Sequence, residues 1–253
     1  MKIPINIPDI DDEEIRAVRH VLSEKSLTSS SFDGGVHVQQ FEKLVSKFVK
    51  SKFTIAVNSG TSALQASLYA LDIKSGDEVL VPSFTFVATA NSVKAVGAKP
   101  VFVDITRENY TMDPYDLRKK VTKRTKAIIP VHLYGHVAYM EEIIEVAKKN
   151  NLKIIEDASQ SLGSKFKQKH SGTFSHVGCF SFYGTKVMTS GEGGAIVTDE
   201  KNLCEKLKQI RNHGYTKNNL ITRLGLNIRL SEINAAIGKI QMKKLSSFLI
   251  QRR

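Results

Sequence analysis

The stretch FTIAVNSGTSALQASLYAL, residues 53–71, decides the fold class of this chain. Its first five residues are apolar or β-branched and predict a short buried strand. A turn at Gly60 then opens a segment in which Leu64, Leu68 and Leu71 lie at helical spacing. A strand, a tight turn and a helix in this order form the repeating unit of α/β proteins with a parallel sheet.

The same alternation of strand and helix continues toward the C-terminus. Apolar runs that predict strands lie at residues 78–82, 100–105, 126–131 and 153–157, and in GCFSFY (178–183) and GGAIVT (193–198). Helical patterns run through Val93 and Val96, from Asp113-Pro114, at about 138–150 and about 200–212, and onward from the cap residue Ser231. No internal repeat or low-complexity linker interrupts this order, so we expect one large α/β domain.

Two amphipathic helices are predicted ahead of this domain. Ile15 and Leu22 share one helical face, and Phe41 and Val45 share another. We therefore expect residues 1–50 to form an N-terminal helical lead-in.

Composition restricts the class of protein. With 41% hydrophobic and 25% charged residues, the 253-residue chain has the balance of a globular protein. Neither a signal-peptide pattern nor an apolar run of membrane-spanning length occurs, so we expect a cytoplasmic protein that binds no membrane. Its two cysteines are too few for a disulfide framework or a structural zinc site, and we expect no metal. The net charge of +12 favours anionic partners but does not choose among phosphates, nucleotides and nucleic acid.

Gly60, Thr61 and Ser62 open the first helix of the domain. A helix N-terminus presents unpaired N–H groups and a partial positive charge, and hydroxyl side chains add donors, so this segment is suited to bind a phosphate. Taken alone, the same residues are usually just a helix cap.

Asp157 ends the apolar strand in IIEDASQ. Open α/β sheets place ligand-binding groups at this end of their strands. A carboxylate there can hold a heterocyclic nitrogen protonated through a charge-assisted hydrogen bond. A lone aspartate at a strand end is also typical of a cap or, in other folds, of a metal ligand.

Lys186 lies in FSFYGTKVMTSGEGGAIVT, among apolar and small residues rather than on a charged helix face. Burial would lower the pKa of its amine and free it for attack on a carbonyl. Isolated lysines are usually solvent-exposed, and the sequence EGG is usually a hairpin turn.

One cofactor accounts for all three elements. Pyridoxal phosphate (PLP) carries a phosphate, for Gly60, Thr61, Ser62 and Ser181, a basic ring nitrogen, for Asp157, and an aldehyde, for Lys186. Phe86, after the strand at 78–82, is placed to stack on the ring, although an aromatic residue on a helix more often packs in the core.

The chain as a whole resembles the DegT/DnrJ/EryC1/StrS family of sugar aminotransferases, which belongs to fold type I of the PLP-dependent enzymes. The motifs that carry the resemblance occur in the family's order: PINIPDIDDEEI, NSGTSAL, PSFTFVATANSV, PVHLYGH, IIEDASQSLGS, FSFYGTKVMTSGEGGAIVT, RNHGY and GLNIRLSEINAAIGKIQMKKL. The resemblance implies a three-layer α/β/α sandwich around a mostly parallel seven-stranded sheet.

The resemblance also assigns roles to individual residues. It makes Lys186 the lysine linked to the cofactor's aldehyde and Asp157 the partner of the pyridinium nitrogen, and it puts Gln160 near the phenolic oxygen. Phosphate contacts fall to Thr61, Ser62 and Ser181, and ring stacking falls to Phe86. Asn227, in GLNIRL, corresponds to a residue that reaches the phosphate of the neighbouring subunit, which implies a homodimer with shared active sites.

The implied reaction moves an amino group from an amino acid, glutamate in most of the family, to a nucleotide-linked keto sugar for polysaccharide or antibiotic assembly. FSFYGTK followed by SGEGG is most similar to the perosamine-synthase-like branch, whose acceptors are nucleotide-linked 4-keto-6-deoxy sugars. The implied PLP-binding domain spans residues 51–230. Residues 231–253 would begin the helix that leads to a small C-terminal domain of roughly a hundred residues, most of which we expect this chain to lack.

Three alternatives compete with this prediction. A related branch dehydrates the sugar, but it carries histidine in place of the lysine, which Lys186 opposes. A truncated homologue that binds PLP or a nucleotide sugar without turnover, or one half of a split enzyme, fits the short chain. A nucleic-acid-binding protein would fit the charge of +12, but the sequence has no recognised binding motif, and we expect no nucleic-acid partner.

Three histidines are left without a role by the sequence. His132 follows a predicted strand and fits either the substrate side of a site or a satisfied structural position. His136 and His213 are equally ambiguous, and none of the three is counted as catalytic.

Overall fold

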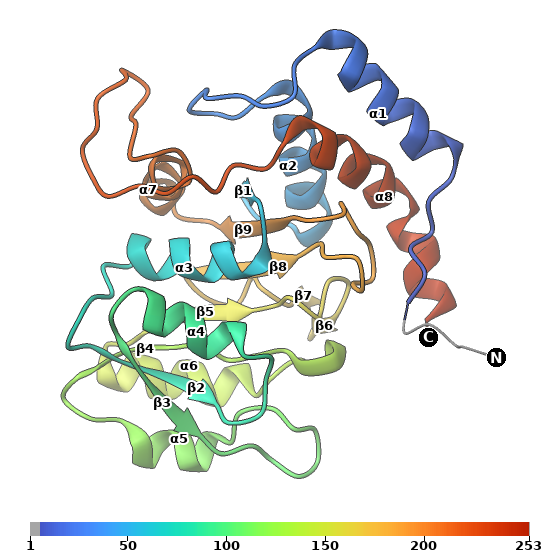
Figure 1. Ribbon diagram of the computed structural model, residues 1–253. Helices are drawn as coiled ribbons and strands as arrows, with labels where there is room; N and C mark the ends of the chain where they lie inside the picture. The colour runs from blue at the N-terminus through green and yellow to red at the C-terminus, as the bar shows by residue number, and fades with distance from the viewer. Residues whose placement is uncertain (1–5, 253) are drawn as a thin grey trace.

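The computed structural model describes residues 6–252 and has the predicted α/β fold (Figure 1). The first five residues of the predicted lead-in and the last residue of the predicted C-terminal segment lie outside this range.

A seven-stranded sheet forms the middle layer, with the strand order β1-β9-β8-β5-β4-β2-β3 (Figure 1). The strands are β1 (Phe53–Val57), β2 (Glu78–Pro82), β3 (Lys99–Val103), β4 (Thr125–Ile128), β5 (Lys153–Asp157), β8 (Val177–Ser181) and β9 (Gly194–Thr198). Only β9 runs against its neighbours β1 and β8, and the other pairs are parallel. The prediction of a mostly parallel seven-stranded sheet is confirmed. A short hairpin of β6 (Lys165–Phe166) and β7 (Lys169–His170) lies apart from the sheet.

Helices cover both faces of the sheet, which confirms the three-layer prediction. One face carries α3 (Gly60–Ala70), α4 (Ala88–Ala95) and α7 (Lys201–Arg211). The other face carries α2 (Val36–Val49), α5 (Pro114–Lys120), α6 (Met140–Asn150) and α8 (Glu232–Gln251). Because side chains alternate along a strand, Ile55 packs toward α3 while Ala56 packs toward α2.

Side-chain caps fix where several helices begin. The Ser59 hydroxyl accepts a hydrogen bond from the backbone of Ser62 at the start of α3, and Asp113 and Ser231 cap α5 and α8 in the same way. Both the Asp113-Pro114 start and the Ser231 start were predicted from the sequence. The remaining helix, α1 (Asp12–Glu24), begins with a capping box between Asp11 and Glu14 and packs on α8. Within residues 6–252, no helix has both the length and the apolar character needed to cross a bilayer.

A buried ion pair ties α2 to α7. The Arg211 side chain is 2% exposed and donates from Nη1 to Glu42 Oε1 at 2.6 Å and from Nη2 to the carbonyl oxygen of Phe32 at 3.0 Å. Glu42 also accepts the backbone N–H of Ala56 on β1 at 2.8 Å. Burial raises the pKa of the Glu42 carboxyl, although the Arg211 guanidinium opposes this effect.

We expect Arg211→Ala to lower the free energy of unfolding by about 3–5 kcal/mol, because it leaves the Glu42 carboxylate buried without its cation. Urea denaturation followed by circular dichroism measures the change. The matched control is Lys167→Ala, which breaks the exposed ion pair with Glu141 and should leave the urea midpoint nearly unchanged. Equal effects of the two substitutions would contradict this account of the buried pair.

Candidate active site

The loops after β1, β2, β5 and β8 meet at one edge of the sheet, because these four strands run in the same direction. Between the loops lies a cavity of about 350 Å³. Seven of the predicted site residues line it: Gly60, Thr61, Phe86, Asp157, Gln160, Ser181 and Lys186. Segments that are more than a hundred residues apart in sequence thus supply a single cavity.

Lys186 lies in the loop between β8 and β9, where its backbone N–H bonds the carbonyl oxygen of Tyr183 at 2.9 Å. The residue is half-buried on the wall of the cavity. Burial lowers the pKa of its amine, while the charge of Asp157 acts in the opposite direction. A partly desolvated amine with a lowered pKa is more often uncharged, which is the form that attacks a carbonyl.

Asp157 ends β5 and is only 5% exposed. Its Oδ2 accepts a hydrogen bond from the Thr89 hydroxyl at 2.8 Å, and its Oδ1 accepts one from the backbone N–H of Ser159 at 3.2 Å. Its backbone is fixed by bonds to the carbonyl oxygen of Pro130 and from the N–H of His132. The carboxylate therefore enters the cavity in a defined orientation.

The N-terminus of α3 also borders the cavity, and it carries the partial positive charge of a helix start. A Cβ added to Gly60 would lie 2.8 Å from the Cβ of Ser181, so only glycine lets the helix approach β8 this closely. Unpaired N–H groups and the Thr61 and Ser181 hydroxyls then border one space suited to an anion. Ser62 is buried, and its hydroxyl donates to Asn58 Oδ1 at 2.6 Å, so it supports the turn and is not among the residues that line the cavity.

Phe86 is 70% exposed and lies on the cavity wall, ahead of the first residue of α4. The alternative that it packs in the core on a helix is wrong, because α4 begins only at Ala88. Gln160 also lines the cavity, and its Oε1 accepts the backbone N–H of Tyr134 at 3.1 Å. This contact leaves the amide NH₂ of Gln160 available as a donor.

Asn227 is exposed, and its backbone forms an isolated antiparallel β-bridge with that of Asn212. It is not among the residues that line the cavity. Its predicted contact with a neighbouring subunit stays a prediction.

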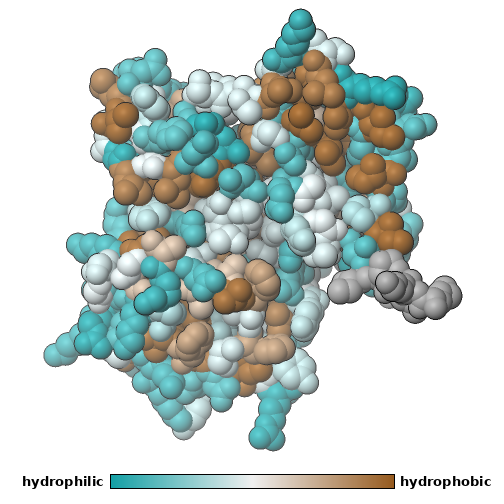
Figure 2. Space-filling model, in the orientation of Figure 1, coloured by the Kyte–Doolittle hydropathy of each residue, from teal (hydrophilic) through white to brown (hydrophobic). Residues whose placement is uncertain are grey.

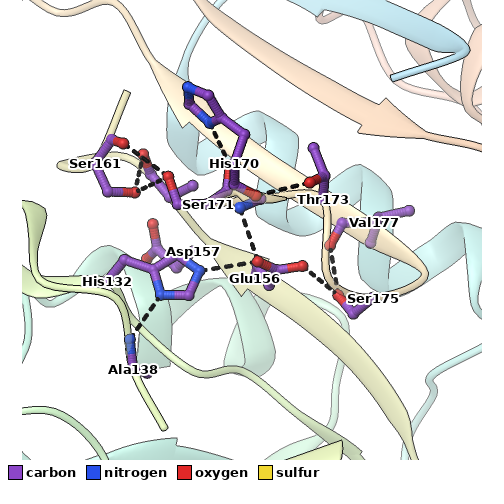
Figure 3. A network of polar contacts seen from close by, with 12 residues as sticks. His132, Ala138, Glu156, Asp157, Ser161, His170, Ser171, Thr173, Ser175 and Val177 are labelled. Atoms are coloured by element: carbon purple, nitrogen blue, oxygen red, sulfur yellow. Dashed lines mark hydrogen bonds and ion pairs between the residues drawn. The ribbon is translucent and has the colours of Figure 1, made fainter. Parts of the chain in front are cut away.

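His132 is part of a buried polar network behind the site (Figure 3). Its Nδ1 accepts the backbone N–H of Ala138 at 3.1 Å, so the proton lies on Nε2, which is 2.9 Å from Glu156 Oε2. The Glu156 carboxylate also accepts bonds from the Gly172 N–H at 2.7 Å and the Ser175 hydroxyl at 2.8 Å. His132 is thus a satisfied structural histidine.

Sequence reasoning missed several residues that line the cavity: Ser59, Leu64, Thr85, Ala88, Ser159, Tyr183, Thr185 and Glu192. Ser59 had a usable signal, because serine directly before a predicted helix is a typical cap. Glu192 had none beyond its place in a sequence that reads as a turn. His136 and His213 are exposed and line neither this cavity nor the larger one beside it.

That larger cavity has a volume of about 830 Å³ and shares Ser159, Gln160, Ser181, Thr185 and Lys186 with the first. It extends outward along Tyr134 and the segment 162–164 to Leu249 on α8. Lys186 therefore faces two adjoining spaces.

Known proteins are similar to this chain in sequence and in fold. GDP-perosamine synthase of Escherichia coli O157:H7 is 38% identical over 253 residues, which cover 99% of this chain and 68% of that protein. The crystal structure of an aminotransferase from Psychrobacter cryohalolentis superposes with a TM-score of 0.91 at 34% identity, covering 96% of this chain and 65% of that one. The PLP form of the sugar aminotransferase Spr1654 from Streptococcus pneumoniae has a TM-score of 0.90 at 28% identity, covering 98% and 68%.

The chain thus spans about two thirds of the length of the relatives that it matches. The model of one family matches residues 8–253, nearly the whole sequence. The chain therefore belongs to the DegT/DnrJ/EryC1/StrS aminotransferase family.

Proposed function

We propose that this protein is a PLP-dependent aminotransferase that moves an amino group from glutamate to a nucleotide-linked 4-keto-6-deoxy sugar. One observation carries the proposal: the amine of Lys186, the carboxylate of Asp157 and the N-terminus of α3 border the same cavity. An amine of lowered pKa, a buried acid and an anion site are the three groups that this cofactor requires.

The residues present fit pyridoxal phosphate. The N-terminus of α3, Thr61 and Ser181 would hold the phosphate, and Asp157 would bond the ring nitrogen. Phe86 supplies an exposed aromatic face for the ring, and the free NH₂ of Gln160 is suited to an anionic oxygen. A PLP form of a family relative supports this assignment.

The bound cofactor supplies an electron sink for the carbon that loses its proton. Lys186 would carry the proton in this transfer, because its amine has a lowered pKa and lies on the wall of the cavity that would hold the cofactor. Asp157 would keep the ring nitrogen protonated through a charge-assisted hydrogen bond, and two donors already hold its carboxylate in place. The apolar wall at Leu64 and Ala88 reduces the access of water to this site.

The larger cavity beside Lys186 supports a large second substrate. A net charge of +12 favours a ligand with a diphosphate, and a relative at 38% identity is named for GDP-perosamine. These observations favour an acceptor that is linked to a nucleotide over an acceptor that carries no nucleotide.

A homodimer is part of the proposal. The loop that follows α7 exposes Leu220, Ile221 and Leu224, each at least 60% accessible, just ahead of Asn227. Figure 2 shows apolar side chains on this loop, at the upper left of the view, and others over α1 at the upper right. An apolar loop beside Asn227 supports the contact of Asn227 with a second copy.

We expect the purified chain to develop a visible absorbance band with pyridoxal phosphate and to lose it on addition of glutamate. Lys186→Ala should remove the protein-specific band and slow amino transfer by at least about 10²-fold, because it removes both the attachment point and the base. Stopped-flow absorbance measures both effects. Transfer by Lys186→Ala at the parent rate would refute the assignment.

The lowered pKa of Lys186 predicts a pH dependence. Near pH 7 a larger fraction of this amine is uncharged than of an ordinary exposed lysine. Borohydride reduction in the presence of pyridoxal phosphate should therefore label Lys186 ahead of exposed lysines at about pH 7. This preference should shrink toward about pH 10, where exposed amines also lose their protons. Peptide mapping by mass spectrometry measures the labels, and even labelling at pH 7 would contradict the prediction.

The acceptor is tested with a panel of nucleotide-linked keto sugars, using glutamate as donor and Lys186→Ala as the blank. We expect 4-keto-6-deoxy sugars to be aminated at least about tenfold faster than 3-keto sugars, as judged by mass spectrometry of the products. Preference for a 3-keto sugar would move the protein to another branch of the family.

A further inference from the structure

Thr89 is fully buried, yet its hydroxyl makes the shortest contact with the Asp157 carboxylate. It lies in the first turn of α4, which follows β2, whereas Asp157 ends β5. β4 separates these two strands in the sheet, so the contact joins distant parts of the sequence. Thr89 is absent from the residues that line the cavity, so it reaches the acid from behind.

The direction of the hydrogen bonds follows from proton counting. An ionised carboxylate only accepts, so the single hydroxyl proton of Thr89 points to Asp157 Oδ2 at 2.8 Å. The Thr85 hydroxyl lies 3.1 Å from that of Thr89, and it must be the donor in this second bond. Thr85 lines the cavity, so a chain of two hydroxyls runs from the cavity wall to the carboxylate.

Two fixed donors determine the plane of the carboxylate. Thr89 holds Oδ2 from α4, and the Ser159 N–H holds Oδ1 from the loop after β5. A carboxylate offers about four lone-pair sites, so each oxygen keeps capacity for a further partner on the cavity side. Without Thr89, rotation about the Cβ–Cγ bond of Asp157 would be restrained at one oxygen only.

We infer that Thr89 is a positioning residue, which holds the Asp157 carboxylate in the orientation that meets the ring nitrogen of the cofactor. This inference rests on the proposed function for the identity of the ligand. It assigns to α4 a role in the chemistry beyond covering the sheet. Thr89 is fully buried, and its hydroxyl carries the role.

The test compares Thr89→Val, which keeps the shape and removes the donor, with Thr89→Ser, which keeps the donor. Thr54→Val is the matched control, because Thr54 is also buried and lies outside this cavity. Among residues 6–252 its hydroxyl bonds only that of Ser46 on α2, at 2.7 Å. The measurements are the Kd for pyridoxal phosphate from absorbance titration, the kcat and the KM for glutamate from steady-state amino transfer to the keto sugar, and the thermal midpoint.

We expect Thr89→Val to raise the Kd for the cofactor and to lower kcat by about 10- to 100-fold each, with a smaller change in the KM for glutamate. Thr89→Ser should stay within about threefold of the parent in both quantities, and Thr54→Val within about twofold. A Thr89→Val protein that loses thermal stability but keeps the parent Kd and kcat would overturn the inference, because the hydroxyl would then serve packing alone.

Crystal structures of the cofactor-free Thr89→Val and Thr89→Ser proteins separate this inference from the proposed function. The Asp157 carboxylate should be rotated in the valine variant and unchanged in the serine variant. An unrotated carboxylate in Thr89→Val would refute the positioning role even if the parent binds pyridoxal phosphate. A parent chain that gives no visible band would refute the proposed function instead, whatever the carboxylate does.

Discussion

The buried carboxylate of Asp157 is the constraint on which the rest of the site depends. A charge that is only 5% exposed is costly unless hydrogen bonds replace its water. This protein supplies two donors to the carboxylate, the Thr89 hydroxyl from α4 and the Ser159 N–H from the following loop. Backbone bonds to the segment after β4 hold the main chain of Asp157 itself. Each partner fixes one element of the fold relative to the end of β5. The same contacts therefore both order the sheet edge and orient the acid.

Two adjacent acidic residues on β5, Glu156 and Asp157, point to opposite faces of the sheet. Side chains alternate along a strand, so Asp157 points to the face of α3 and α4, while Glu156 points to the opposite face. Glu156 is fully buried, and its carboxylate accepts hydrogen bonds from His132, the Gly172 N–H and the Ser175 hydroxyl (Figure 3). These partners order the segment that enters β8, the strand that ends at Ser181 and precedes Lys186. Glu156 thus orders the segment ahead of β8, whereas Asp157 lies with Lys186 on the wall of one cavity.

Close backbone approach completes the arrangement. A Cβ on Gly194 would lie 2.3 Å from the carbonyl oxygen of Ser59, and a Cβ on Gly60 would meet Ser181. The glycines let the N-terminus of α3 reach the edge of β8 and β9, where its N–H groups face the same cavity as Lys186. An anion site, an acid and an amine are thereby brought together by one sheet edge.

The sequence by itself determined the α/β class, the strands, the caps at Asp113 and Ser231, and the grouping of Lys186 with Asp157, because these follow from local periodicity and from motifs in a fixed order. It did not reveal the role of Thr89, because the residues around Thr89 predict only a helix. It also did not reveal the role of His132, which depends on its contact with Glu156 on the neighbouring strand β5. Only the tertiary structure decided these, and it also showed that Ser62 supports the turn instead of lining the cavity. The physical reason is that spacing along the chain records which face a residue takes within its own element, whereas hydrogen bonds between α4 and β5 depend on how separate elements pack.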